Sequence, residues 1–138
     1  MGLPDVVPQT GVDAELPCSY TLFAPSNPQS VKICRDFVRG ALEALGLSHL
    51  GDAAALCTSE LVTNVHRHAK GDVHLRAAVG AKHVRIAVYD GSSRLPSPRR
   101  ADAEDDGGRG LFLVTALSDL CGVTPAGVGK GVWFQLNR

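Results

Sequence analysis

The sequence predicts a single α+β domain, a two-layer sandwich in which helices cover one face of a mixed β-sheet. Segments 28–45 and 52–70 carry apolar residues at the spacing of amphipathic helices. Segments 16–23, 73–79 and 84–90 alternate apolar and polar residues, as half-buried strands do. With a third helix and two more strands near 121–124 and 131–137, the order is strand, helix, helix, strand, strand, long loop, helix, strand, strand.

Composition is that of an ordinary soluble globular protein and gives no sign of a nucleic-acid-binding or membrane protein. The chain has 138 residues, with 14 basic and 14 acidic side chains and a formal net charge of zero, so no basic excess points to nucleic acid. No apolar run approaches the roughly 18 residues of a membrane span. None of the four cysteines forms a CxxC pair. We interpret them as reduced core thiols and expect a cytoplasmic protein.

The N-terminal half contains clear boundary signals. Residues 1–14 are rich in Pro and Gly and are expected to form a poorly ordered tail, with the single domain spanning 15–138. Ser26 or Asn27 is predicted to cap the first helix, which Gly46 ends. Ser48 and Asp52 are both candidate caps for the second helix.

The second helix carries a polar pair at the border of its apolar face. Glu60 and Asn64 are one helical turn apart and therefore project to the same side. A carboxylate and a neutral amide in one space are suited to proton transfer and to holding hydrated Mg²⁺. An exposed helical pair without function is the competing interpretation of these two residues alone.

The predicted hairpin over 73–90 ends in a carboxylate. Asp90 shares the inward parity of Val84, Ile86 and Val88, so it is expected at the end of a buried row. Such a carboxylate needs hydrogen-bond donors. The turn after it is one source, and the amino group of a ligand such as adenine is another.

A long segment and a glycine-rich helix start follow. Residues 91–108 are predicted to form a lid, with a solvated insertion as the alternative. Gly107 to Gly110 precede or open a helix from about Arg109 to Leu120, with core positions at Leu111, Val114 and Leu117. Free backbone N–H groups there favour a phosphate, and Arg109 would add charge-assisted hydrogen bonds. A flexible loop end is the competing interpretation.

Four motifs in order resemble the ATP-binding fold shared by DNA gyrase B, MutL and histidine-kinase catalytic domains. The chain is most similar to the single-domain branch of that family, the bacterial anti-sigma-factor serine kinases. Glu60–Ala69 resembles the helical N box, Val88–Gly91 the first glycine box, Gly108–Leu111 the second box with its lid, and Gly129–Phe134 the closing strand.

The resemblance implies a site for ATP and Mg²⁺. Glu60 would be the general base, Asn64 would bind the metal, and Asp90 would accept from the adenine amino group. The implied nucleotide-binding residues are Asn64, Asp90, Gly91, Gly108, Arg109, Gly110 and Leu111. The implied function is serine phosphorylation of an anti-anti-sigma-type partner together with sigma-factor sequestration, with a homodimer expected from the family alone. The alternative is a non-catalytic ATP-binding module, or a nucleotide-free one.

Two positions depart from the family pattern. Ser92 replaces a frequent glycine, which predicts a stiffer adenine loop. Gly131 replaces a frequent threonine, which predicts a missing contact on the adenine side.

Overall fold

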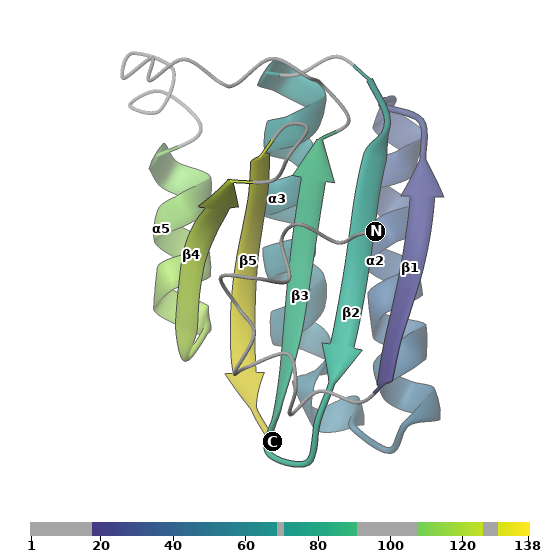
Figure 1. Ribbon diagram of the computed structural model, residues 1–138, viewed down its shortest axis with the longest axis vertical. Helices are drawn as coiled ribbons and strands as arrows, with labels where there is room; N and C mark the ends of the chain where they lie inside the picture. Colours follow the sequence, from purple (N-terminus) through teal and green to yellow (C-terminus); the bar gives the residue numbers. More distant parts are fainter. Residues whose placement is uncertain (1–17, 69–70, 91–107, 126–129) are drawn as a thin grey trace.

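The computed structural model describes residues 18–68, 71–90, 108–125 and 130–138. The predicted tail 1–14 and the lid, apart from Gly108, lie outside these ranges. The elements are β1 (Cys18–Ala24), α2 (Pro28–Ala44), the 3₁₀ helix η2 (Ser48–Leu50), α3 (Gly51–His68), β2 (Val73–Val79), β3 (His83–Asp90), α5 (Gly108–Leu117), β4 (Leu120–Pro125) and β5 (Lys130–Asn137). Figure 1 shows a sheet with α2 and α3 packed behind it and α5 beside β4. The predicted α+β class with two layers is confirmed.

The sheet is antiparallel at each described pairing, so the expectation of a mixed sheet is wrong. Its five strands lie in the order β1-β2-β3-β5-β4. The antiparallel direction follows from how many helices and strands connect two neighbouring strands of the sheet. Two helices, α2 and α3, return the chain from β1 to β2, and α5 with β4 returns it from β3 to β5. With two connecting elements, each of which reverses the chain, the second strand runs opposite to the first. A single crossover helix would have made the two neighbouring strands parallel.

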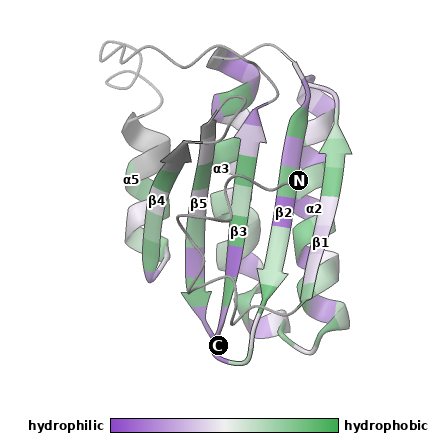
Figure 2. Ribbon diagram, viewed as in Figure 1, coloured by the Kyte–Doolittle hydropathy of each residue, from purple (hydrophilic) through white to green (hydrophobic). Residues whose placement is uncertain are grey.

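The core lies between the sheet and the helices. The predicted inward positions of β2 and β3 are buried, and Phe134 of β5 completes the central row beside Ile86. Figure 2 shows apolar residues along β2, β3 and β5. On α3, Ala54, Leu61 and Val62 are buried. β3 is the middle strand of the five, with two strands on each side.

Helix α2 follows the predicted signals closely. Asn27 is the N-cap, and its Oδ1 accepts hydrogen bonds from the backbone N–H of Ser30 at 3.0 Å and from the Ser30 hydroxyl at 3.1 Å. Gly46 has φ +79°, a left-handed conformation that favours glycine and ends the helix. The buried face contains Cys34, Val38 and Leu42.

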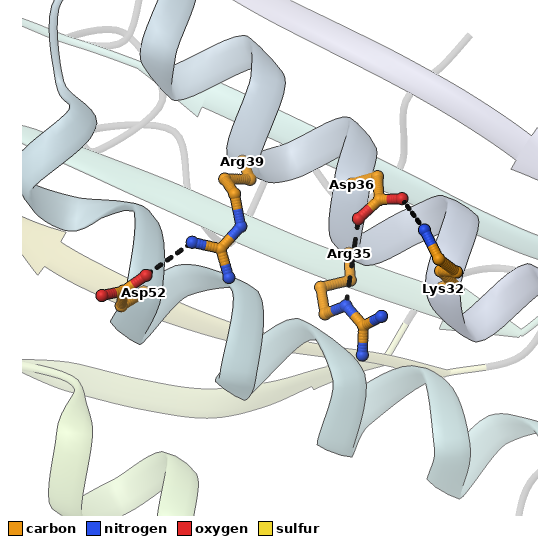
Figure 3. Close-up of polar contacts among 5 residues, drawn as sticks. All are labelled: Lys32, Arg35, Asp36, Arg39 and Asp52. Atoms are coloured by element: carbon orange, nitrogen blue, oxygen red, sulfur yellow. Dashed lines mark hydrogen bonds and ion pairs between the residues drawn. The ribbon is translucent and has the colours of Figure 1, made fainter.

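The start of α3 differs from the predicted caps. Ser48 opens η2, and Asp52 lies inside the first turn of α3. The Asp52 carboxylate instead accepts from the guanidinium of Arg39 and so joins the two helices across their connection (Figure 3). An acidic side chain is also favourable in a first turn, because it faces the positive end of the helix dipole.

Helix α5 ends three residues earlier than predicted, at Leu117. The Ser118 hydroxyl donates to the carbonyl of Val114, and the backbone N–H of Asp119 already donates to the carbonyl of Gln135. The chain therefore enters the sheet where the pattern predicts further helix. Val114 is fully buried as expected, but Leu117 is 39% exposed, since α5 lies at the edge of the sheet. The side chain of Leu111 lies outside the described part of the chain.

The prediction that all four cysteines are reduced core thiols is correct for two of them. All four thiols are free, and Cys34 and Cys57 are buried, but Cys18 and Cys121 are exposed. The exposed pair belongs to β1 and β4, the two edge strands. The helices of the described segments all lack the length or the apolar run that a bilayer crossing requires.

Candidate functional site

The polar pair of α3 lies where the sequence places it, at the border of the core. Glu60 and Asn64 are both half-buried, while Leu61 and Val62 between them are buried against the sheet. Anchoring the helix by its apolar residues fixes the direction in which the polar pair projects.

The surroundings of Cys57 show which elements lie next to the side of α3 that carries Glu60. Burial, together with the smaller effects of the charges of Cys121 and Glu60, raises the pKa of the Cys57 thiol to about 11. Cys121 belongs to β4, and α5 packs along α3. The Cys57 and Glu60 side of α3 is therefore directed toward α5 and β4 rather than toward α2.

The opposite side of α3 makes a contact that sequence reasoning missed. The Ser26 hydroxyl and Nδ1 of His66 form a hydrogen bond of 3.3 Å between the β1–α2 turn and α3. The partners are 40 residues apart, so no local pattern signals the pair. The contact fixes the part of α3 that follows Asn64.

Asp90 is the last residue of β3 and lies on its core-facing row. It pairs with Val73, follows Val88 on the same face, and is 7% exposed. The predicted parity is confirmed. Its carboxylate oxygens are hydrogen-bond acceptors placed at the end of an otherwise apolar row, which suits recognition of an amino group.

Helix α5 begins at Gly108, so the glycine-rich segment does open a helix. The N-terminus of α5 and the end of β3 lie at the upper end of the molecule in Figure 1, where α3 also ends. The side chain of Arg109 lies outside the described part of the chain, as does Gly91, while Gly110 belongs to the first turn of α5.

The residues present are compatible with a magnesium nucleotide. Among the described residues, no three His, Cys, Asp or Glu side chains are grouped so as to hold a metal ion by themselves. Mg²⁺ bound with a nucleotide does not need such a group, because phosphate oxygens and water supply most of its ligands. The amide oxygen of Asn64 can serve as one metal ligand, and the backbone N–H groups in the first turn of α5 can bind phosphate oxygens.

Gly131 does not face the Asp90 side of the sheet. It pairs with Tyr89, whose side chain lies on the opposite face, and a Cβ built on Gly131 would lie 2.6 Å from Cδ1 of Tyr89. A hydroxyl at position 131 would therefore meet the tyrosine ring. The prediction that this glycine removes a contact on the adenine side is not supported by the register, which places position 131 on the face opposite Asp90.

A two-layer sandwich with a strand-end carboxylate, a polar helix border and a glycine-rich helix start defines a nucleotide-binding domain. Residues 24–136 match the family described as the histidine kinase-like ATPase domain, and the chain belongs to that family. The match supports ATP binding and a regulatory role. A comparison with curated proteins gives no match.

Proposed function

We propose that the protein binds Mg-ATP at the end of the sheet marked by Asp90 and transfers phosphate to a serine of an anti-anti-sigma-type partner, and that it also sequesters a sigma factor. The observation that carries the nucleotide site is the burial of Asp90 on the core-facing row of β3, at the end of the sheet where α3 ends and α5 begins. Membership of the histidine kinase-like ATPase family supports the identity of the nucleotide.

Each residue of the site has one role in this proposal. Asp90 accepts a hydrogen bond from the adenine amino group. Gly91, the next residue, also belongs to the nucleotide-binding site. Asn64 holds Mg²⁺ through its amide oxygen. The backbone of Gly108 and Gly110 binds phosphate oxygens at the α5 N-terminus.

The charge of Arg109 adds to phosphate binding, and Leu111 contributes an apolar contact. Glu60 accepts the proton of the attacking hydroxyl. Bound ATP supplies the phosphoryl group, and the protein contributes mainly positioning and charge stabilisation.

Thermal unfolding with and without Mg-ATP tests the binding site. At a ligand concentration 100 times Kd, binding stabilises the folded state by about 2.7 kcal/mol, or roughly 8 °C for a chain of this size. We expect this shift for the wild type, and its loss in Asp90→Asn and Asn64→Ala. Asp72→Asn, an exposed aspartate before β2, is the matched control and keeps the full shift. No shift in the wild type would contradict nucleotide binding, and equal shifts in all variants would contradict these residue roles.

Phosphate transfer is tested separately with Glu60→Gln. The variant is expected to bind Mg-ATP like the wild type but to transfer no labelled phosphate to an anti-anti-sigma-type protein. Glu43→Gln, on the exposed side of α2, is the control that keeps activity. If the wild type binds ATP and transfers nothing to such proteins, the chain is a non-catalytic binding module and the kinase proposal fails.

A further inference from the structure

The hydrogen bond between Ser26 and His66 lies at the end of the sheet that carries Asp90. It joins the β1–α2 turn to the last turn of α3, with 3.3 Å between the serine hydroxyl oxygen and Nδ1 of the imidazole. Ala24, the last residue of β1, pairs with Val73, which pairs on its other side with Asp90. Ala24 and Asp90 are therefore about 10 Å apart, across two strand spacings. The β1–α2 turn thus leaves the sheet at its Asp90 end, the upper end in Figure 1.

The turn that carries Ser26 is held in a defined conformation. Asn27 caps α2 by accepting two hydrogen bonds from Ser30. The backbone N–H of Asn27 donates to the carbonyl of Pro25 at 3.0 Å. Pro25 and Pro28 fix their own φ angles on the two sides of Ser26. Ser26 is therefore a fixed point to which the end of α3 can be attached.

Asn64 lies near the end of α3, where a helix is least constrained. The helix ends at His68, and the carbonyls of a last helical turn have no partner within the helix. In an α-helix the N–H at position 68 donates to the carbonyl at position 64. If the final turn frays, the backbone that directs the Asn64 amide loses this support.

His66 belongs to this final turn and projects from the side of α3 opposite to Asn64. Leu61 and Val62 anchor the helix to the sheet before this point, and Val65 is only partly buried against the core. The contact with Ser26 restrains the turn that follows these apolar anchors. Because it limits both fraying and rotation of that turn, it also limits the directions available to Asn64.

We propose that Ser26 and His66 are positioning residues of the candidate magnesium site, and that their hydrogen bond keeps the Asn64 amide directed at the metal. Neither side chain is assigned a contact with the nucleotide. This inference rests on the proposed function, because it takes Asn64 to hold the Mg²⁺ of Mg-ATP. It adds that the β1–α2 turn, far from Asn64 in the sequence, controls how tightly the metal nucleotide is bound.

The test measures the Kd of Mg-ATP and the Kd of ATP in EDTA, both from the dependence of the melting temperature on ligand concentration. Ser26→Ala and His66→Gln are expected to weaken Mg-ATP binding by roughly 2- to 10-fold, the range that loss of one hydrogen bond allows. In EDTA there is no metal for Asn64 to hold, so both variants should bind ATP as the wild type does. A merely structural role would change both affinities or neither.

Conservative variants separate the hydrogen bond from the rest of each side chain. Ser26→Thr keeps the hydroxyl, and His66→Asn keeps a polar atom near the position of Nδ1, so both should retain most of the Mg-ATP affinity. Ser19→Ala and His49→Gln, at exposed positions elsewhere, are matched controls that leave both affinities unchanged. The double variant Ser26→Ala/His66→Gln should bind no more weakly than either single variant, because each change removes the same contact.

Two results would overturn the inference and leave nucleotide binding intact. One is wild-type affinity for Mg-ATP in Ser26→Ala and His66→Gln, and the other is an equal loss of affinity with and without Mg²⁺. Circular dichroism verifies folding, and if one of the two variants does not fold, the other gives the same comparison. Absence of any Mg-ATP stabilisation in the wild type would instead contradict the proposed function, and this inference with it.

Discussion

Replacing Gly131 by alanine is expected to destabilise the protein because the tyrosine ring of β3 occupies the space of the new methyl group. The added Cβ would lie 2.6 Å from Cδ1 of Tyr89 and closer still to Cε1. Carbon atoms in favourable contact are about 3.5 Å or more apart, so the ring must move by about 1 Å. Overpacking of this kind costs roughly 1–3 kcal/mol. The reduced entropy of the unfolded chain offsets about 0.4–1 kcal/mol, which leaves a net loss of roughly 1–2 kcal/mol.

Urea unfolding followed by circular dichroism measures this loss as a lower midpoint at unchanged slope. Gly40→Ala is the matched control, because a Cβ added at this position of α2 would have nothing within 4 Å. It is expected to stabilise by about 0.5–1 kcal/mol. The Tyr89→Ala background removes the ring and should abolish the cost at position 131, a coupling that a double-mutant cycle detects. If Gly131→Ala is as stable as the wild type, or equally destabilised with and without Tyr89, the ring does not lie on the glycine.

Three further outcomes are expected. Cys34 and Cys57 should react with a thiol reagent only on unfolding, because burial raises both pKa values and excludes the reagent, whereas the two edge-strand cysteines react at once. The hydrogen bond from Lys32 lowers the pKa of Asp36 from the usual aspartate value, so the stabilising contribution of this carboxylate is present above the usual pKa and is lost as the pH falls through the lowered one. When unfolding free energy is measured at decreasing pH, Asp36→Asn should therefore lose less stability on acidification than the wild type. Phe134→Ala should cost about 3–5 kcal/mol in urea, because the ring is fully buried.

The parts of the fold that depend on neighbouring residues were predictable from the sequence. Asn27, the apolar face of α2 and Gly46 act within one or two helical turns, so their signals are local. The inward position of Asp90 follows from strict alternation along β3, which the structure confirms.

The parts that depend on distant residues were not predictable in the same way. The antiparallel order requires knowing which strands become neighbours, and β3 lies beside β5 rather than β4. The exposure of Cys18 and Cys121 follows from that order, since it makes β1 and β4 the edges. The end of α5 is set by the hydrogen bond from Asp119 to Gln135, a residue of the last strand.

The two faces of the sheet share strand β3, and this links the Tyr89 side of the sheet to the candidate nucleotide site. Tyr89 and Asp90 are consecutive residues that project to opposite faces. The ring shift that Gly131→Ala imposes on Tyr89 is therefore expected to disturb the backbone that carries Asp90. Gly131→Ala should then be stabilised less by Mg-ATP than the wild type, whereas Gly40→Ala, on α2, should keep the full stabilisation. Equal stabilisation of both variants would show that the two faces are not coupled through β3.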